Sequence, residues 1–136
     1  MSNYTPIQIL CVEDDKDTCD LITLILNQEG YEVFAAETMD KALSIVLNEN
    51  VSLCILDGKL PDGNGTDLCR KIKESNKNIP VIFYSAAART IDIKAAREAG
   101  ADEYLIKPLG WDKLVETVNK ILKPSRQDLI NNQIAG

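Results

Sequence analysis

The sequence predicts an α/β fold in which a five-stranded parallel sheet is doubly wound, with helices on both faces. Short apolar runs rich in β-formers alternate with longer segments of helical periodicity, and the connections between them are short. The short runs are apolar on both faces, which is typical of parallel strands covered by helices on both sides. Right-handed crossovers, nearly universal between parallel strands, restrict the topology further.

The elements follow from this alternation in chain order. The predicted strands cover residues 7–12, 32–36, 53–56, 81–84 and 104–106. Apolar residues spaced three or four apart predict the helices between and after them. The first helix contains residues 21–26 and stops at Gly30, the second starts near Thr38, the third contains Leu68, Cys69 and Ile72, the fourth covers 91–99 before Gly100, and the fifth covers 111–122 before Pro124.

Length, composition and net charge limit the classes of protein to which the chain can belong. The chain has 136 residues, of which 45% are hydrophobic and 26% charged, as expected for one globular domain. We expect that domain over residues 1–124, and a tail or the start of a linker over 125–136. With 21 acidic and 15 basic residues, the net charge of -6 argues against direct binding of nucleic acid or anionic membranes. No leader segment or bilayer-spanning run is evident, so a soluble cytoplasmic protein is expected.

The residue types that are missing narrow the chemistry. The chain has no histidine, which excludes Ser-His-Asp and Cys-His nucleophile pairs and His-ligated zinc within it. The four cysteines have no CxxC spacing and lie among apolar neighbours, which favours buried reduced thiols: Cys11, Cys19, Cys54 and Cys69. Carboxylates must therefore carry any chemistry.

Polar residues stand at the carboxyl ends of four predicted strands. Glu13 and Asp14 follow the first strand, Asp57 ends the third, Ser85 the fourth and Lys107 the fifth. Carboxyl ends of parallel strands meet at one edge of the sheet, where ligands bind. Clustered carboxylates repel one another, and a hard divalent cation such as Mg²⁺ relieves that repulsion. The sequence therefore predicts a metal site at this edge.

Helix capping is the plainer interpretation of any one of these acids. An acid after a strand often caps the next helix, and Asp15 or Asp17 is expected to cap the first one. Capping does not explain why acids, a hydroxyl and a lysine coincide at the same edge of several strands.

Four segments together resemble the receiver domains of two-component response regulators. They are residues 9–15 (ILCVEDD), Asp57 with 60–65 (LPDGNG), residues 80–86 (PVIFYSA) and residues 100–108 (GADEYLIKP). The likeness covers roughly residues 7–123, and the order and spacing of the segments make it specific. It implies a flavodoxin-like, CheY-like sheet with strand order 2-1-3-4-5.

The resemblance also implies the roles of the acidic residues. Asp57 would be the phospho-acceptor, attacking the phosphohistidine of a partner histidine kinase or histidine phosphotransfer protein. Asp14 and Asp57 would bind Mg²⁺ directly, Glu13 would bind it through water, and the backbone carbonyl of Lys59 would complete the protein's ligands. The cation would neutralise charge and orient in-line transfer.

Further positions match the part of the family site that reads the modification. Lys107 would face the carboxylate of Asp57 and then a phosphoryl oxygen, while Ser85 would bind another oxygen. The peptide bond of Pro108 is expected to be cis. Tyr104 matches the family's aromatic switch, although its plainer interpretation is a half-buried aromatic packed on the last helix.

The leading hypothesis is a signalling module and not a conventional enzyme. Phosphorylation would switch the face formed by the fourth helix, fifth strand and fifth helix, which an unknown output partner reads; a phosphorylation-dependent homodimer through these helices is left open. A Mg²⁺-dependent phosphohydrolase would need an acid two residues after the nucleophile, where Lys59 stands. A phosphorylation-independent interaction module is the alternative. Lys59, together with Ala87, leaves the lifetime of the phosphoryl group open.

Overall fold

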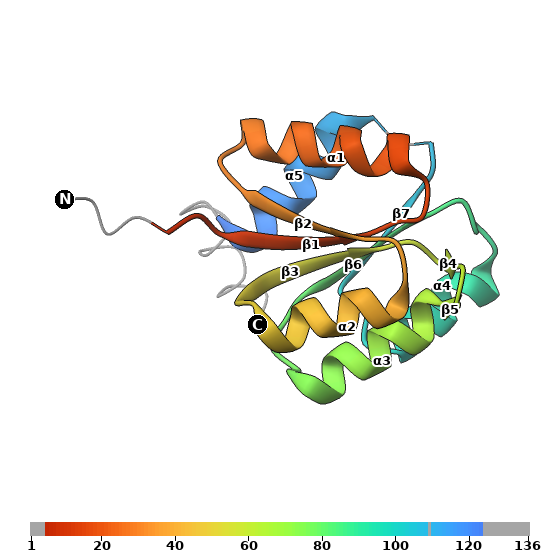
Figure 1. Ribbon diagram of the computed structural model, residues 1–136. Coiled ribbons are helices and arrows are strands. Elements are labelled where there is room, and N and C mark those ends of the chain that lie inside the picture. Colours follow the sequence, from red (N-terminus) through yellow and green to blue (C-terminus); the bar gives the residue numbers. More distant parts are fainter. Residues whose placement is uncertain (1–4, 109, 124–136) are drawn as a thin grey trace, which may run out of the picture.

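The computed structural model describes residues 5–108 and 110–123 (Figure 1). In chain order its elements are β1 (Gln8–Val12), α1 (Lys16–Gln28), β2 (Glu32–Ala36), α2 (Met39–Asn48), β3 (Val51–Leu56), β4 (Lys59–Leu60), β5 (Gly63–Asn64), α3 (Gly65–Ser75), β6 (Val81–Ser85), α4 (Thr90–Glu98), β7 (Glu103–Ile106) and α5 (Trp111–Leu122). The main sheet has five parallel strands in the order β2-β1-β3-β6-β7. Since β6 and β7 are its fourth and fifth strands, the expected order 2-1-3-4-5 is confirmed.

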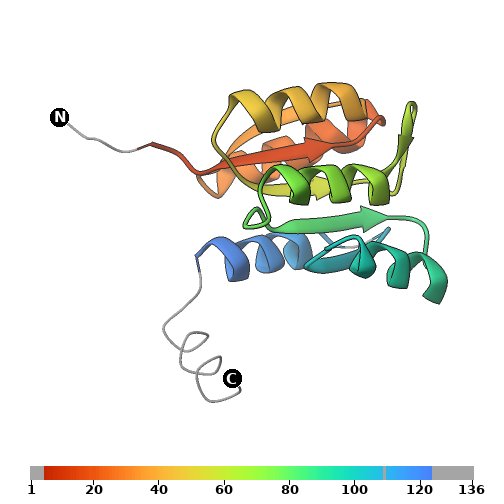
Figure 2. The same cartoon turned by 90° about the horizontal axis from the view of Figure 1, so that it is seen from below.

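The sheet separates two hydrophobic layers. Helices α1 and α5 cover one face, and α2, α3 and α4 cover the other (Figures 1 and 2). Successive strand residues point to opposite faces, so Leu10 and Val12 pack toward α2 and α3, whereas Ile9 and Cys11 pack toward α1 and α5. All four are at most 1% exposed. This double burial explains why β1 is apolar at every position from Ile9 to Val12.

Three of the helices have an N-cap side chain that accepts a hydrogen bond from an amide of the first turn. Asp15 is the N-cap of α1 and accepts a hydrogen bond from the backbone amide of Thr18 at 3.0 Å, so the prediction that Asp15 or Asp17 caps this helix is confirmed for Asp15. Thr38 caps α2 and Asn64 caps α3 in the same way. Gly30, with φ of 92°, follows the end of α1.

The structure differs from the prediction in element boundaries and in one extra motif. β3 begins at Val51, two residues earlier than expected, and ends at Leu56, so that Asp57 follows the strand instead of ending it. The segment after it forms a small antiparallel hairpin, β4–β5, which the predicted elements do not include. The predicted tail, residues 125–136, lies outside the described residues.

The cysteines and the helix lengths agree with the sequence analysis. All four cysteines are buried and free, as predicted. Within residues 5–108 and 110–123, no helix combines the length and the apolar character needed to cross a bilayer.

Candidate functional site

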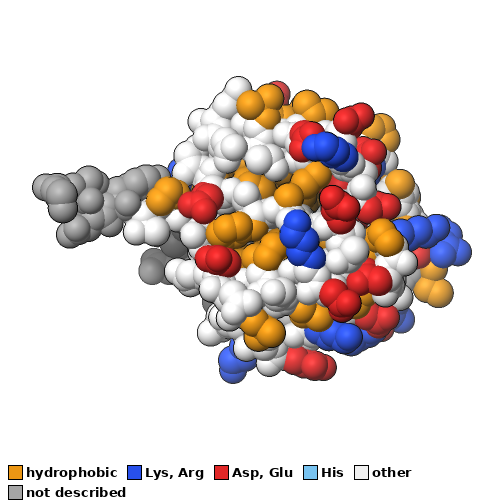
Figure 3. Space-filling model, viewed as in Figure 1, with side chains coloured by type: hydrophobic (Ala, Val, Ile, Leu, Met, Phe, Trp, Pro, Cys, Tyr) orange, Lys and Arg blue, Asp and Glu red, His pale blue; other side chains and the backbone are white. Residues whose placement is uncertain are grey.

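Backbone hydrogen bonds fix the polar residues at the carboxyl edge of the sheet. Beyond the strand ends, the amide of Glu13 donates to Ala36, the amide of Asp57 donates to Val12, both at 3.0 Å, and the amide of Lys107 donates to Ser85 at 2.9 Å. The ladder thus continues for one residue past β1, β3 and β7. Figure 3 shows acidic side chains concentrated on this side of the molecule. The predicted convergence on one edge is confirmed.

Three carboxylates form a cluster there. Glu13, Asp14 and Asp57 each present an oxygen within 4.8 Å of the others. Glu13 is only 3% exposed, and its Oε2 has no hydrogen-bond partner in the described part of the chain. Burial, together with the neighbouring Asp57, raises the pKa of Glu13 to about 7. Oxygen donors at this spacing, with one buried oxygen unpaired, fit a hard divalent cation such as Mg²⁺.

Lys107 lies among these acids, but not where its closest contact was expected. Its Nζ is 2.5 Å from Oε1 of Glu13 and 3.6 Å from Oδ2 of Asp57, so Glu13 is the nearer partner. Burial opposes the charged form of Lys107, yet the bond to Glu13 and the charge of Asp57 outweigh it and raise the pKa of Lys107. The Lys107–Pro108 peptide bond is cis, as predicted.

Ser85 lies beside the residue that follows Asp57. A Cβ on Gly58 would come within 2.7 Å of the Ser85 Oγ, so a side chain there would displace the hydroxyl. The same Oγ accepts a hydrogen bond from the backbone amide of Ala87 at 3.2 Å. Gly58 therefore leaves the space that the Ser85 hydroxyl occupies.

Tyr104 packs on the opposite face from the one expected. Its ring stacks on Phe83, with centroids 5.6 Å apart and an interplanar angle of 8°, in the cluster beneath α2, α3 and α4. The interpretation that Tyr104 packs on the last helix is therefore wrong. Its hydroxyl donates to the carbonyl oxygen of Ala87 at 2.6 Å, which connects it through that loop to Ser85.

A cavity of about 310 Å³ opens beside the acid cluster. Its lining comes from the loops after β3, β6 and β7: Asp57, Lys59, Ser85, Ala86, Ala87 and Lys107. Lys59 is exposed at its lip, whereas Ser85 is buried. An anion entering this cavity would meet a carboxylate, a hydroxyl and an ammonium group. Glu13 and Asp14 complete the set outside the lining, so all the sequence-predicted edge residues are brought together.

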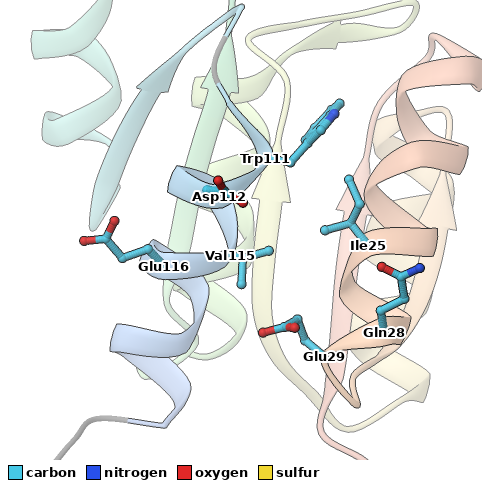
Figure 4. Close-up of a pocket in the computed structure, with 7 residues that line it drawn as sticks. All are labelled: Ile25, Gln28, Glu29, Trp111, Asp112, Val115 and Glu116. Atoms are coloured by element: carbon cyan, nitrogen blue, oxygen red, sulfur yellow. The ribbon is translucent and has the colours of Figure 1, made fainter.

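A second cavity, of about 460 Å³, lies between α1 and α5 and is separate from the site (Figure 4). Trp111 and Val115 of α5 face Ile25 of α1 across it. Its charged lining residues, Glu29, Asp112 and Glu116, are all acidic. Trp111 also meets Tyr84 edge to face at 6.0 Å, which explains the partial burial of Trp111.

Comparison with known proteins identifies the family. A family model for the response regulator receiver domain matches residues 9–119. A crystal structure of a CheY-like response regulator receiver domain protein from Methanospirillum hungatei superimposes with a TM-score of 0.82 at 34% identity, covering 85% of this chain and 93% of that chain. The chain belongs to the response regulator receiver domain family, and its resemblance to that family is confirmed.

Two curated relatives are longer than this chain. A probable transcriptional regulatory protein of Picosynechococcus sp. is 37% identical over 135 residues, which cover 94% of this chain and 53% of that protein. The DNA-binding response regulator MtrA of Mycolicibacterium smegmatis is 31% identical over 121 residues, which cover 89% of this chain and 53% of MtrA. The chain therefore spans about half the length of these relatives. As a receiver domain, it is a module of two-component signalling.

Proposed function

We propose that the chain receives a phosphoryl group on Asp57 and that this modification is its signal. One observation carries the proposal: within the described residues, Asp57 alone belongs both to the carboxylate cluster and to the lining of the cavity with Ser85 and Lys107. A nucleophilic oxygen at that position has oxygen ligands for a cation on one side and two phosphate-binding groups on the other.

In the proposed phosphoryl transfer, one bond to phosphorus forms and another breaks. A carboxylate oxygen of Asp57 attacks the phosphorus of a phosphohistidine, the phosphorus–nitrogen bond breaks, and the imidazole leaves with its electron pair. The product is an acyl phosphate on Asp57. Since this chain has no histidine, the donor is a histidine of a separate kinase domain or phosphotransfer protein. Catalysis extends only to the chain's own phosphorylation and dephosphorylation.

The acid cluster would hold Mg²⁺ during the transfer. Asp14 and Asp57 would bind it directly, Glu13 through water, and the carbonyl of Lys59 would add a fourth protein contact. When bound, the cation neutralises phosphoryl charge and orients the in-line displacement. The unpaired buried Oε2 of Glu13 supports this assignment.

Lys107 and Ser85 would read the modification. The ammonium of Lys107 lies 3.6 Å from Asp57 and would pair with a phosphoryl oxygen, while the Ser85 hydroxyl would donate to another. If Ser85 turns toward the phosphoryl group, its bond to the Ala87 amide breaks, and the loop that Tyr104 holds is released. Tyr104 would then act as the switch.

The face that changes would be α4–β7–α5. Two large apolar side chains are exposed there, Ile91 at 67% and Ile106 at 38%. They support a surface that an output partner, or a second copy of the chain, binds after phosphorylation. In longer relatives the output would be delivered by the other half of the protein, while this acidic domain itself makes no contact with nucleic acid.

The test is intact-mass analysis after incubation with acetyl phosphate, in Mg²⁺ or in chelator. We expect one phosphoryl adduct on the wild type in Mg²⁺ only, and none on Asp57→Asn, whose amide is no nucleophile. An adduct that persists on Asp57→Asn would refute the assignment. Absence of any adduct on the wild type, with rapid hydrolysis excluded by a fast quench, would favour a phosphorylation-independent interaction module.

A second variant tests the readout. Lys107→Ala should still accept the phosphoryl group, but the amide shifts that phosphorylation produces in α4, β7 and α5 should shrink. Heteronuclear NMR before and after phosphorylation measures them. Shifts of wild-type size in Lys107→Ala would show that Lys107 does not couple the site to that face.

A further inference from the structure

The hairpin that follows Asp57 is fastened to the start of α2. Asp62, in the turn between β4 and β5, accepts two backbone hydrogen bonds: Oδ1 from the amide of Met39 at 2.8 Å and Oδ2 from the amide of Asp40 at 3.2 Å. These are the first two amides of α2, 23 and 22 residues away in the chain. The helix end is positive and favours a carboxylate, and the bond to Met39 contributes most to lowering the pKa of Asp62.

The residues at both ends of this hairpin lie at the candidate site. Gly58 follows Asp57 directly, and its carbonyl accepts a hydrogen bond from the amide of Gly65 at 3.0 Å. A Cβ on Gly65, the first residue of α3, would lie 2.3 Å from the carbonyl oxygen of Asp57, so the chain leaving the hairpin passes directly against the backbone of Asp57. Lys59, the first residue of β4, lines the cavity. Any displacement of the hairpin tip therefore changes the surroundings of Asp57.

We propose that Asp62 is a positioning residue for the reaction at Asp57: it clamps the hairpin to α2 and so holds Lys59 at the lip of the cavity. This inference rests on the proposed function, which assigns the Lys59 carbonyl to the cation. Asp62 touches neither the cavity nor the carboxylate cluster. It acts through the backbone between itself and Asp57.

The packing around the clamp leaves the hairpin little freedom while Asp62 is bound. A Cβ on Gly63 would come within 2.3 Å of Met39 Sδ, so the hairpin lies directly on the first residue of α2. Leu60 is 8% exposed and anchors the other strand of the hairpin in the core. The core contact fixes how deep the hairpin lies, and Asp62 fixes its position along the end of α2.

Helix capping alone does not require Asp62. The N-cap of α2 is Thr38, whose Oγ1 accepts from the amide of Lys41 at 3.2 Å. The first amides of a helix can also be satisfied by water when they are exposed. Thr38 thus supplies a matched control: it bonds to the same helix end but is not part of the hairpin.

The experiment compares Asp62→Ala with Thr38→Ala in the full chain. Two quantities are measured: the Kd for Mg²⁺ by calorimetry, without any phosphodonor, and the initial rate of phosphoryl adduct formation from acetyl phosphate. We expect Asp62→Ala to weaken Mg²⁺ binding about tenfold, as removal of a residue supporting a metal ligand does, and to slow phosphorylation. Thr38→Ala should leave both close to their wild-type values, because Thr38 is not part of the hairpin. Urea unfolding should show a similar modest loss of stability in the two variants.

Rescue separates positioning from general destabilisation. Asp62→Asn keeps one carbonyl oxygen for the Met39 amide and should recover most of the Mg²⁺ affinity. Equal Kd and rate for Asp62→Ala and Thr38→Ala would overturn the proposal. So would an Asp62→Asn variant as impaired as Asp62→Ala despite wild-type unfolding. A wild type that binds Mg²⁺ but takes no phosphoryl group would refute the proposed function, while the Mg²⁺ data would still decide the clamp.

Discussion

Carboxylates at the two edges of the parallel sheet have different surroundings. At the carboxyl edge, three carboxylates lie within 4.8 Å, and Glu13 keeps a buried oxygen unpaired among the described residues. At the amino edge, Asp102 accepts from the amide of Val81 at 2.8 Å and from Lys73 Nζ at 3.0 Å. Crowded like charges lower stability, whereas paired groups contribute to it.

A second network at the amino edge shows the same pairing. The Tyr31 hydroxyl donates to Asn119 Oδ1 at 2.5 Å, and the Asn119 amide donates to Glu29 at 3.1 Å. Lys123 lies over the Tyr31 ring at 4.6 Å and bonds to the Glu29 carbonyl. These contacts fasten the end of α5 to the end of α1. Gln8, at the amino end of β1, also has a buried oxygen without a partner among the described residues, so the difference between the edges lies in their carboxylates. Carboxylates at the amino edge are paired with an amide, a lysine or an asparagine, whereas those at the carboxyl edge are crowded together and available to a cation.

The largest expected effect is on the pH dependence of stability without divalent cation. The pKa of Glu13 is raised from 4.5 to about 7 in the folded protein, so folding retains a proton that the unfolded chain releases. The contribution of Glu13 to the unfolding free energy should therefore be largest below about pH 4.5 and be lost as pH rises from there to about 7, by at most about 3 kcal/mol. Glu13→Gln should remove this loss. Urea unfolding in chelator from pH 5 to 8 measures it; equal slopes in both proteins would contradict the account.

The next largest effect is expected when the hydrogen bonds of Asp102 at the amino edge are removed. Asp102→Ala leaves the buried amide of Val81 without its acceptor and frees Lys73, so we expect a loss of about 2 kcal/mol in unfolding free energy. Phosphorylation by acetyl phosphate should continue at the wild-type rate below the unfolding transition. Glu103→Ala, at the exposed neighbouring residue, is the control and should change stability by less than about 0.5 kcal/mol. Comparable losses in the two variants would show that the hydrogen bonds of Asp102 do not contribute to the unfolding free energy.

The smallest effect concerns one hydroxyl. Tyr31→Phe removes the bond to Asn119 while keeping the ring beneath Lys123, and should cost about 1 kcal/mol in chemical denaturation. Tyr84→Phe is the matched control, because the Tyr84 hydroxyl makes no hydrogen bond within the part of the chain that the structure describes. A Tyr31→Phe protein as stable as Tyr84→Phe would show that the hydrogen bond from Tyr31 to Asn119 does not stabilise the fold.

Much of the fold could be predicted because its elements carry strong local patterns. β2 and α5 match their predicted ranges, and the edge residues converge because strand ends in a parallel sheet must do so. The β4–β5 hairpin was missed because two-residue strands are too short to show periodicity. Its Pro61-Asp62-Gly63 turn was the visible signal.

The errors at the site have physical causes. Strand alternation could have placed Tyr104 correctly, because its register partner Phe83 shares its face while Leu105 faces α5. The preference of Lys107 for Glu13 over Asp57 could not be read from sequence, since it depends on fractions of an ångström between neighbouring carboxylates. The space that Gly58 leaves for the Ser85 hydroxyl likewise depends on two segments far apart in the sequence and leaves no local pattern.

The most direct test of the contrast between the edges is urea unfolding of the wild type and Asp57→Asn, each in chelator and in millimolar Mg²⁺. Removing one carboxylate charge should make Asp57→Asn more stable than the wild type in chelator. Mg²⁺ should stabilise the wild type by binding its folded state, and should stabilise Asp57→Asn much less. An Asp57→Asn protein that is less stable in chelator, or a wild type indifferent to Mg²⁺, would contradict the claim that this edge is built to hold a cation.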